Sequence, residues 1–245
     1  QLDHAGLSWK GYMEDMGADP QREASTCGHV AAGTYDDTHK ASAKDEYADK
    51  HNPFVYFHSI LDDGAGCNAH VVNLSTLTKD LQRVRTTPNF AFIAPGLCHD
   101  GHDAPCADGE PGGLISADHF LRTWVPRITQ SPAFRRDGLL IVIFDEGGDA
   151  TACCGETALP GGPQPGKFGP GGGKVGAVML SPFIAPGTVS KLPYNHYSLL
   201  RSIEDIYGLD HLGMAGAGRL RSLGPDVFTG PAHAHPAASM STNAR

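Results

Sequence analysis

Two adjacent carboxylates, Asp145 and Glu146, directly follow an apolar run at residues 139–144 and precede Gly147. Six apolar residues in a row, without alternation, predict a parallel strand that is buried on both faces. In open α/β sheets, ligands bind beyond the carboxyl ends of such strands. Adjacent carboxylates repel each other, and a metal ion or a shared proton relieves that repulsion. The pair therefore has two interpretations: a metal or catalytic site, or two solvated acids at the start of a loop.

A second group of titratable residues follows another strand-like run, residues 89–95. The group comprises His99, Asp100, His102 and Asp103, four titratable side chains within five positions. Such a density is unusual for a surface loop, and its place after a strand matches that of Asp145 and Glu146.

A third group lies at residues 194–197, which open a helix-patterned stretch from 198 to 207 that Gly208 is expected to end. His196 in this group can point from a helix start into a cleft. A single histidine at such a position is more often a structural cap. Three acid or histidine groups at strand ends and a helix start together favour an active site.

At these residues the chain resembles the phosphoesterase family of secreted acid phosphatases and phospholipases C, a branch of the alkaline-phosphatase-like superfamily. The similarity is greatest to the acid phosphatases, some of which act on phosphoinositides. No single motif is decisive, but six in the same order over roughly residues 5–210 are specific. The matching stretches are residues 8–15, 50–54, 88–90, 100–103, 144–147 and 195–200.

The resemblance implies an α/β fold: an alkaline-phosphatase-like sandwich with a mainly parallel central sheet flanked by helices, truncated at its N-terminus. Residues 1–229 are then the catalytic domain, with a Gly/Pro-rich loop at 147–173, and residues 230–245 form a disordered tail. Family members carry a Glu-Asn metal-binding pair and a Ser or Thr nucleophile upstream of the matching region. The 245 residues contain no Glu-Asn dipeptide, so we expect this fragment alone to be inactive.

The implied activity is metal-dependent hydrolysis of phosphate monoesters through a covalent phospho-enzyme. One divalent metal ion would be held by Asp145, Glu146 and Asp100, and would polarise the ester. His102 and His196 would donate hydrogen bonds to the phosphoryl group, and one of them could act as the general acid.

Five further residues have weaker implied roles. Asp103 would orient His102 or complete the metal shell, as Asp100 also could. Lys50 and His51 would contact the substrate phosphate, although a turn role before Pro53 is an equal alternative for His51. Glu14 and Asp15 match the family pattern without a chemical role beyond orienting neighbours.

The six cysteines favour an oxidising compartment, and hence a secreted protein. Spacing suggests the pairs Cys98–Cys106 and Cys27–Cys67 and a vicinal pair Cys153–Cys154, but the sequence leaves other connectivities open. A zinc site competes with this scheme. It is weaker, because no Cys-x-x-Cys pair occurs and the resemblance implies oxygen ligands.

Charge and hydropathy restrict the partners. Acids outnumber bases 27 to 19, and the net charge of −8 argues against nucleic-acid binding and against docking on anionic membranes. No apolar run is long enough to span a bilayer. The expected partner is a small phosphate ester or a phospholipid headgroup. A phospholipase C and a non-enzymatic, metal-stabilised binding domain remain as alternatives.

The sequence also predicts the main helices, strands and loops around the acid and histidine groups. Residues 7–13 alternate like a strand, residues 28–49 read as an exposed loop with a short helix, and residues 175–180 read as a strand. Ser116 is expected to cap a helix whose core face carries Phe120, Leu121, Trp124 and Ile128. Pro126 is expected to kink or end that helix.

Overall fold

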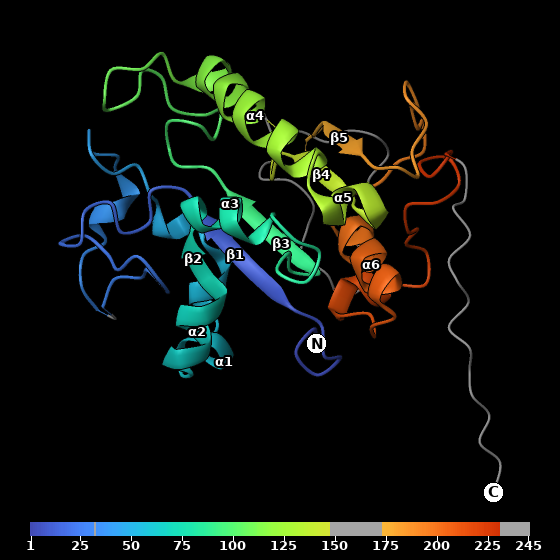
Figure 1. The fold of residues 1–245 in the computed structure, drawn as a ribbon, viewed down its shortest axis with the longest axis horizontal. Helices are drawn as coiled ribbons and strands as arrows, with labels where there is room; N and C mark the ends of the chain where they lie inside the picture. Colours follow the sequence, from blue (N-terminus) through green and yellow to red (C-terminus); the bar gives the residue numbers. More distant parts are fainter. Residues whose placement is uncertain (32, 148–172, 231–245) are drawn as a thin grey trace, which may run out of the picture. The chain divides into compact units, whose positions relative to one another are not determined.

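The computed structural model describes residues 1–31, 33–147 and 173–230, which divide into two compact units (Figure 1). Unit 1 comprises Gln1–Phe134, and unit 2 comprises the chain from Arg135 onward. The Gly/Pro-rich segment 148–172, with Cys153 and Cys154, and the tail after residue 230 lie outside the described residues. Within them, no helix is long and apolar enough to cross a membrane.

Unit 1 is built on a three-stranded parallel sheet of order β2-β1-β3. Its strands are β1 (Trp9–Met13), β2 (Val71–Asn73) and β3 (Phe90–Ala94). The two longer strands pair in register from Trp9 opposite Phe90 to Met13 opposite Ala94, so their carboxyl ends coincide. The predicted strands at 7–13 and 89–95 are therefore confirmed, as is the mixed α/β class with a parallel sheet.

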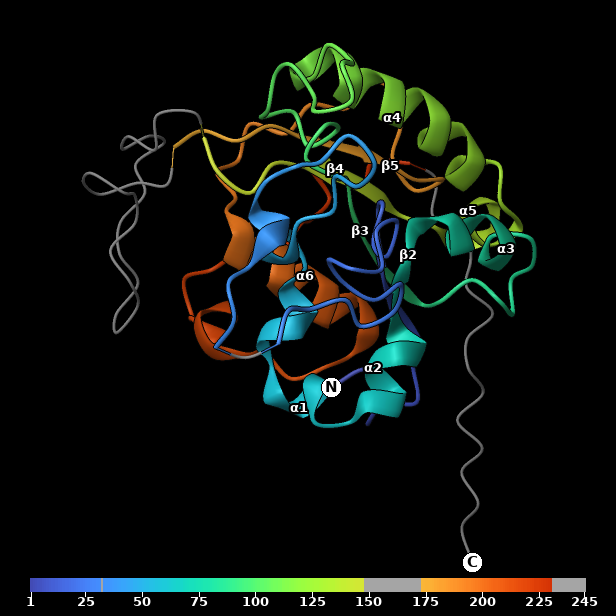
Figure 2. The same ribbon diagram turned by 90° about the vertical axis from the view of Figure 1, so that its left-hand side faces the viewer.

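Helices cover both faces of this sheet because β1 is apolar on both sides (Figure 2). Trp9 and Met13 point to one face, where α1 (His58–Leu61) and α2 (Gly64–His70) pack side by side. Tyr12 points to the other face, towards α3 (Leu77–Asp80) and α4 (Gly113–Thr129). Gly11 allows this close packing, since a Cβ there would lie 2.5 Å from the Phe54 ring.

Helix α4 has the predicted core face but different ends. Phe120 and Trp124 are buried, and Leu121 and Ile128 pack against them. The prediction that Ser116 caps the helix is wrong: the helix begins at Gly113, and the Ser116 hydroxyl accepts a hydrogen bond from the Gly112 N–H (2.9 Å). The helix also continues past Pro126 to Thr129, because a proline in the last turn removes only one main-chain bond.

The segment 28–49 departs from the exposed loop that its polarity predicts. Thr38, Asp45 and Glu46 are buried. Arg22 explains the difference: its guanidinium donates to the main-chain carbonyls of Asp37, Lys40 and Asp45 and so gathers the polar segment around one buried cation. The short helices near it are all 3-10 turns: η1 (Asp37–His39), η2 (Asp49–His51), η3 (Pro53–Tyr56) and η4 (Leu74–Thr76).

Two disulfides brace unit 1, and both were predicted. Cys27 and Cys67 join with a Cα–Cα distance of 5.3 Å, and Cys98 and Cys106 with one of 5.0 Å. Because these four sulfur atoms are covalently paired, they are not available as zinc-binding thiolates. The zinc interpretation therefore fails for the cysteines of the described residues.

Unit 2 contains an antiparallel pair, β4 (Leu140–Ile143) and β5 (Ala177–Leu180), followed by helix α6 (His196–Tyr207) and turn η5 (Gly213–Gly216). A short helix, α5 (Pro132–Asp137), precedes β4. The prediction of a parallel strand buried on both faces is wrong for β4. Its one partner among the described residues is antiparallel, and Ile143 is 37% exposed. An unbroken apolar run specifies a strand but not the direction of its partner.

Helix α6 matches its prediction closely. The side chain of Asn195 accepts a hydrogen bond from the Ser198 N–H (3.0 Å), which caps the N-terminus. Gly208 ends the helix in the left-handed conformation (φ 66°) that glycine adopts without steric cost. These two caps fix His196 as the first residue of the helix.

Candidate functional site

The end of β4 and the start of α6 bring Asp145 and His196 together in unit 2. The Nε2 of His196 donates a hydrogen bond of 2.6 Å to the main-chain carbonyl of Asp145, 51 positions away. Since a carbonyl only accepts, the Nε2 must carry the proton. The Asn195 cap and the strand end hold this contact from both sides.

The carboxylates of Asp145 and Glu146 are exposed beside this contact. One oxygen of Asp145 accepts the Glu146 N–H (3.0 Å), which fixes the turn after the strand. Adjacent carboxylates offer the hard oxygen ligands that divalent cations bind. Among the described residues, these two carboxylates do not belong to a group of three or more closely spaced ligand atoms. By themselves they supply only part of the ligands of a metal ion.

In unit 1, the loop after β3 carries Asp100, His102 and Asp103. Asp100 accepts the main-chain N–H of His102 (2.7 Å), and Asp103 bonds the Nδ1 of its ring (2.8 Å). The hydrogen bond to Asp103 raises the pKa of His102, although the ring is 86% exposed. Lys50 of η2 is near enough to oppose this rise electrostatically. The loop therefore presents the exposed ring of His102, a readily protonated hydrogen-bond donor, with Lys50 nearby. His51, next to Lys50 in the chain, is half-buried.

Sequence reasoning missed a second acidic cluster in unit 1, where the carboxyl ends of β1 and β3 meet. Glu14 accepts the Gly96 N–H (2.8 Å) and lies 3.0 Å from the Nδ1 of His99. This bond raises the pKa of His99, whose Nε2 lies 3.8 Å from Glu110. Glu14 thus ties the two strand ends together through its bonds to the Gly96 N–H and to the His99 ring.

Asp15 and Glu46 extend this cluster. An oxygen of Asp15 accepts the Glu46 N–H (3.2 Å), and Asp15 adopts a positive φ of 59° to reach it. Burial raises the pKa of both carboxyl groups, and the neighbouring charges of Glu14 at Asp15 and of Asp108 at Glu46 raise it further. The signal was present in the sequence: Glu14 and Asp15 follow the strand at 7–13 just as Asp145 and Glu146 follow theirs.

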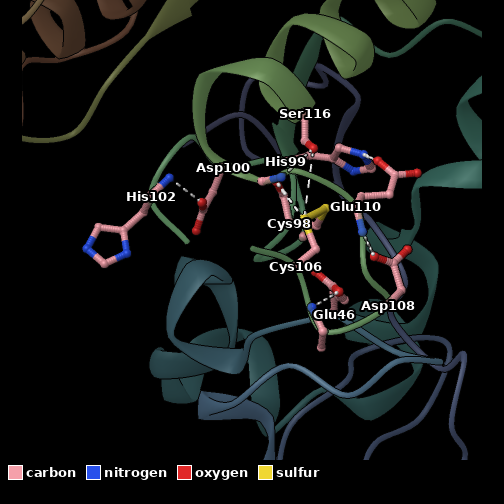
Figure 3. Close-up of a disulfide and its surroundings, with 12 residues drawn as sticks. Glu46, Cys98, His99, Asp100, His102, Cys106, Asp108, Glu110 and Ser116 are labelled. Carbon is pink, nitrogen blue, oxygen red and sulfur yellow. Dashed lines mark hydrogen bonds and ion pairs between the residues drawn. A yellow bond between two sulfur atoms is a disulfide. The ribbon is translucent and has the colours of Figure 1, made fainter. Parts of the chain in front are cut away.

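Two groups of close donors surround the disulfide Cys98–Cys106 (Figure 3). One joins the disulfide to Glu46 and Asp108, and the other joins Cys98 to His99 and Glu110. With the sulfur atoms paired, only oxygen and nitrogen donors remain. Neither group contains a residue that the sequence analysis assigned to the metal.

The parallel sheet covered by helices, with acidic and histidine residues beyond its strand ends, defines an α/β protein with a candidate site at those ends. A comparison with protein families agrees: the pattern of the phosphoesterase family matches residues 1–210. The chain belongs to this family, as the resemblance in its sequence indicated.

The chain is also similar to curated proteins that are named acid phosphatases. The chain is 26% identical to a phosphate-repressible acid phosphatase of Penicillium chrysogenum and to a probable acid phosphatase of Kluyveromyces lactis; each match covers 86% of this chain and 42% of the relative. It is 28% identical to an acid phosphatase of Aspergillus niger over 70% of the chain and 35% of the relative. The chain thus spans less than half the length of these relatives.

Proposed function

We propose that the protein containing this chain hydrolyses phosphate monoesters as a secreted, metal-dependent acid phosphatase. Membership of the phosphoesterase family supports this, as do relatives named acid phosphatases. The observation that carries the proposal is the contact of His196 with Asp145 at the end of β4, beside adjacent exposed carboxylates.

In this proposal Asp145 and Glu146, with Asp100, hold one divalent metal ion, which supplies charge neutralisation and polarises the ester. His196 is fixed by the bond of its Nε2 to the Asp145 carbonyl, and in its imidazolium form it donates through Nδ1 to the phosphoryl oxygens in the reacting state. His102 is the second donor. Asp103 favours its protonated form, which suits a general acid at acidic pH.

We further propose that Lys50 and His51 contact the substrate phosphate, and that a Ser or Thr attacks phosphorus from a segment that the 245 residues do not contain. The greater length of the relatives is consistent with such a segment. A phosphoinositide headgroup is a candidate substrate. Extracellular location is supported by the two disulfides.

The test is a comparison of variants of the complete protein in hydrolysis of a chromogenic phosphate monoester at acidic pH. Asp145→Asn should abolish metal-dependent turnover, and His102→Ala should lower kcat by about a hundredfold or more through lost donation in the transition state. Asp118→Asn, an exposed carboxylate on α4 paired with Arg122, is the matched control and should leave turnover unchanged. Full activity in Asp145→Asn would contradict the assignment of the metal site.

A further inference from the structure

A cavity of about 310 Å³ opens in unit 1 beside the disulfide Cys98–Cys106. We name it the Glu46 cavity. It is lined by Ala41, Glu46 and the run Asp103, Ala104, Pro105, Cys106 and Ala107. One wall therefore comes from the segment gathered by Arg22, and the other from the loop that follows β3 and carries His102.

Glu46 is the buried charged residue of this cavity, with 5% of its surface exposed. One carboxylate oxygen accepts the Ala107 N–H (3.1 Å). The other, Oε2, is buried and has no hydrogen-bond partner among the described residues. Burying a carboxylate oxygen without a partner costs several kcal/mol, on the order of the desolvation of a charged group.

Two hydrogen bonds fix the main chain of Glu46. Its N–H donates to Asp15 (3.2 Å), and its carbonyl accepts from the Leu97 N–H (2.8 Å). These bonds fix the residue between the ends of β1 and β3. The unpartnered oxygen is thus held in place by the fold.

The charges that act on Glu46 are mainly negative. A ligand atom of Asp108 lies within 4.8 Å of the Glu46 carboxylate, and Asp15 adds a further negative charge. Asp103 is a further acidic residue of the lining. Such a group is stabilised either by a proton on one acid or by a cation between them.

We propose that the Glu46 cavity binds a calcium ion through the carboxylates of Glu46 and Asp108. Calcium takes six to eight oxygen ligands in flexible geometry, so main-chain carbonyls and water can complete the shell. Magnesium requires a stricter octahedron, and zinc sites in proteins are built mainly from nitrogen and sulfur ligands, which Glu46 and Asp108 do not supply. The ion joins the loop 103–108 to the Glu46 segment and steadies the loop that carries His102.

The experiment measures calcium binding to chelator-treated protein by isothermal titration at neutral pH. The background is Asp145→Asn combined with Glu146→Gln, which removes two of the three proposed catalytic metal ligands. In this background we expect one calcium ion per chain, with magnesium bound at least tenfold more weakly. Adding Glu46→Gln or Asp108→Asn should weaken calcium binding about tenfold or more, because affinity follows the number of charged ligands. Asp118→Asn is the control and should have no effect.

Binding that is unchanged in both Glu46→Gln and Asp108→Asn would overturn the proposal, as would no binding to the background protein. If circular dichroism shows that Glu46→Gln is misfolded, Asp108→Asn decides, because Asp108 is exposed and its replacement does not disturb the core. A protein that binds no calcium but gains stability from Glu46→Gln holds a proton at this position, which also overturns the proposal. None of these measurements depends on phosphatase activity.

Discussion

Buried carboxyl groups set the pH behaviour of unit 1 at the scale of single residues. Glu23 is 4% exposed, accepts the Gly17 N–H (2.7 Å), and lies beside the fully buried Asp45. Burial raises the pKa of Glu23 well above its usual range, and the charge of Asp45 raises it further. The folded protein therefore keeps a proton on Glu23 that the unfolded chain loses.

Glu23→Gln should stabilise the protein at neutral pH. Because the pKa of Glu23 is higher in the folded state, its contribution to stability is complete below the ordinary carboxyl pKa and is lost as pH rises towards the folded pKa. Glutamine resembles the protonated acid and does not titrate. We expect a gain on the order of 1 kcal/mol at pH 7.5 that vanishes near pH 4, measured by urea unfolding at both values. Equal stability of both proteins at pH 7.5 would show that Glu23 is ionised in the fold.

Position along a strand or helix was enough to single out two residues that lie in contact, while their catalytic and metal-binding roles remain predictions. Asp145 and His196 were identified because each lies at the end of an element, and the structure places them in contact. Glu46 was missed because burial of a polar segment depends on a distant partner. Nothing within residues 28–49 reveals that Arg22 will gather that segment.

At the scale of elements, the disulfides act on loops of different length. Cys27 and Cys67 are separated by 40 positions, and Cys98 and Cys106 by 8. A cross-link stabilises mainly by restricting the unfolded chain, and the effect increases with the enclosed loop.

Replacing both members of a pair by alanine should therefore destabilise the protein unequally. We expect a loss of about 4 kcal/mol without Cys27–Cys67 and about 2.5 kcal/mol without Cys98–Cys106. Denaturant unfolding of the two double variants measures the difference. A larger loss from the shorter loop would indicate that the Cys98–Cys106 bridge acts through the folded state instead, by holding the donors around Glu46.

The elements themselves were predicted from sequence with two errors. Periodicity identified α4 and α6 and the strands β1, β3, β4 and β5. It failed on the direction of β4, since pairing is set by what lies beside a strand and an apolar run fits either orientation. It also placed the start of α4 too late in the chain. Ser116 was expected to precede the helix, but it lies within the first turn, where its hydroxyl accepts a hydrogen bond from the Gly112 N–H.

At the scale of the whole molecule, the convergence of His102 with Asp145 and His196 remains a prediction, as does the extent of the catalytic domain over residues 1–229. The two compact units each carry part of the expected catalytic set: Asp100, His102 and Asp103 in unit 1, and Asp145, Glu146 and His196 in unit 2.

If the nucleophile lies outside the 245 residues, the chain as given should show no turnover of a phosphate monoester, with or without added divalent metal. Adding the preceding segment of the protein should give activity at acidic pH. Steady-state assays on both forms make the comparison, with circular dichroism to verify that each is folded. Robust turnover by the 245-residue chain would place the nucleophile within it.

The strand order β2-β1-β3 has a consequence for how the chain is made. Of these three strands, the first in the chain becomes the central one, and Ser8, just before it, is synthesised 81 positions ahead of Asn89, its hydrogen-bond partner. At usual rates of protein synthesis that interval is roughly 4 to 16 seconds. Throughout it, the edge of β1 that pairs with β3 lacks its partner. The nascent chain therefore carries an unpaired strand edge for longer than a protein whose neighbouring strands are synthesised in succession.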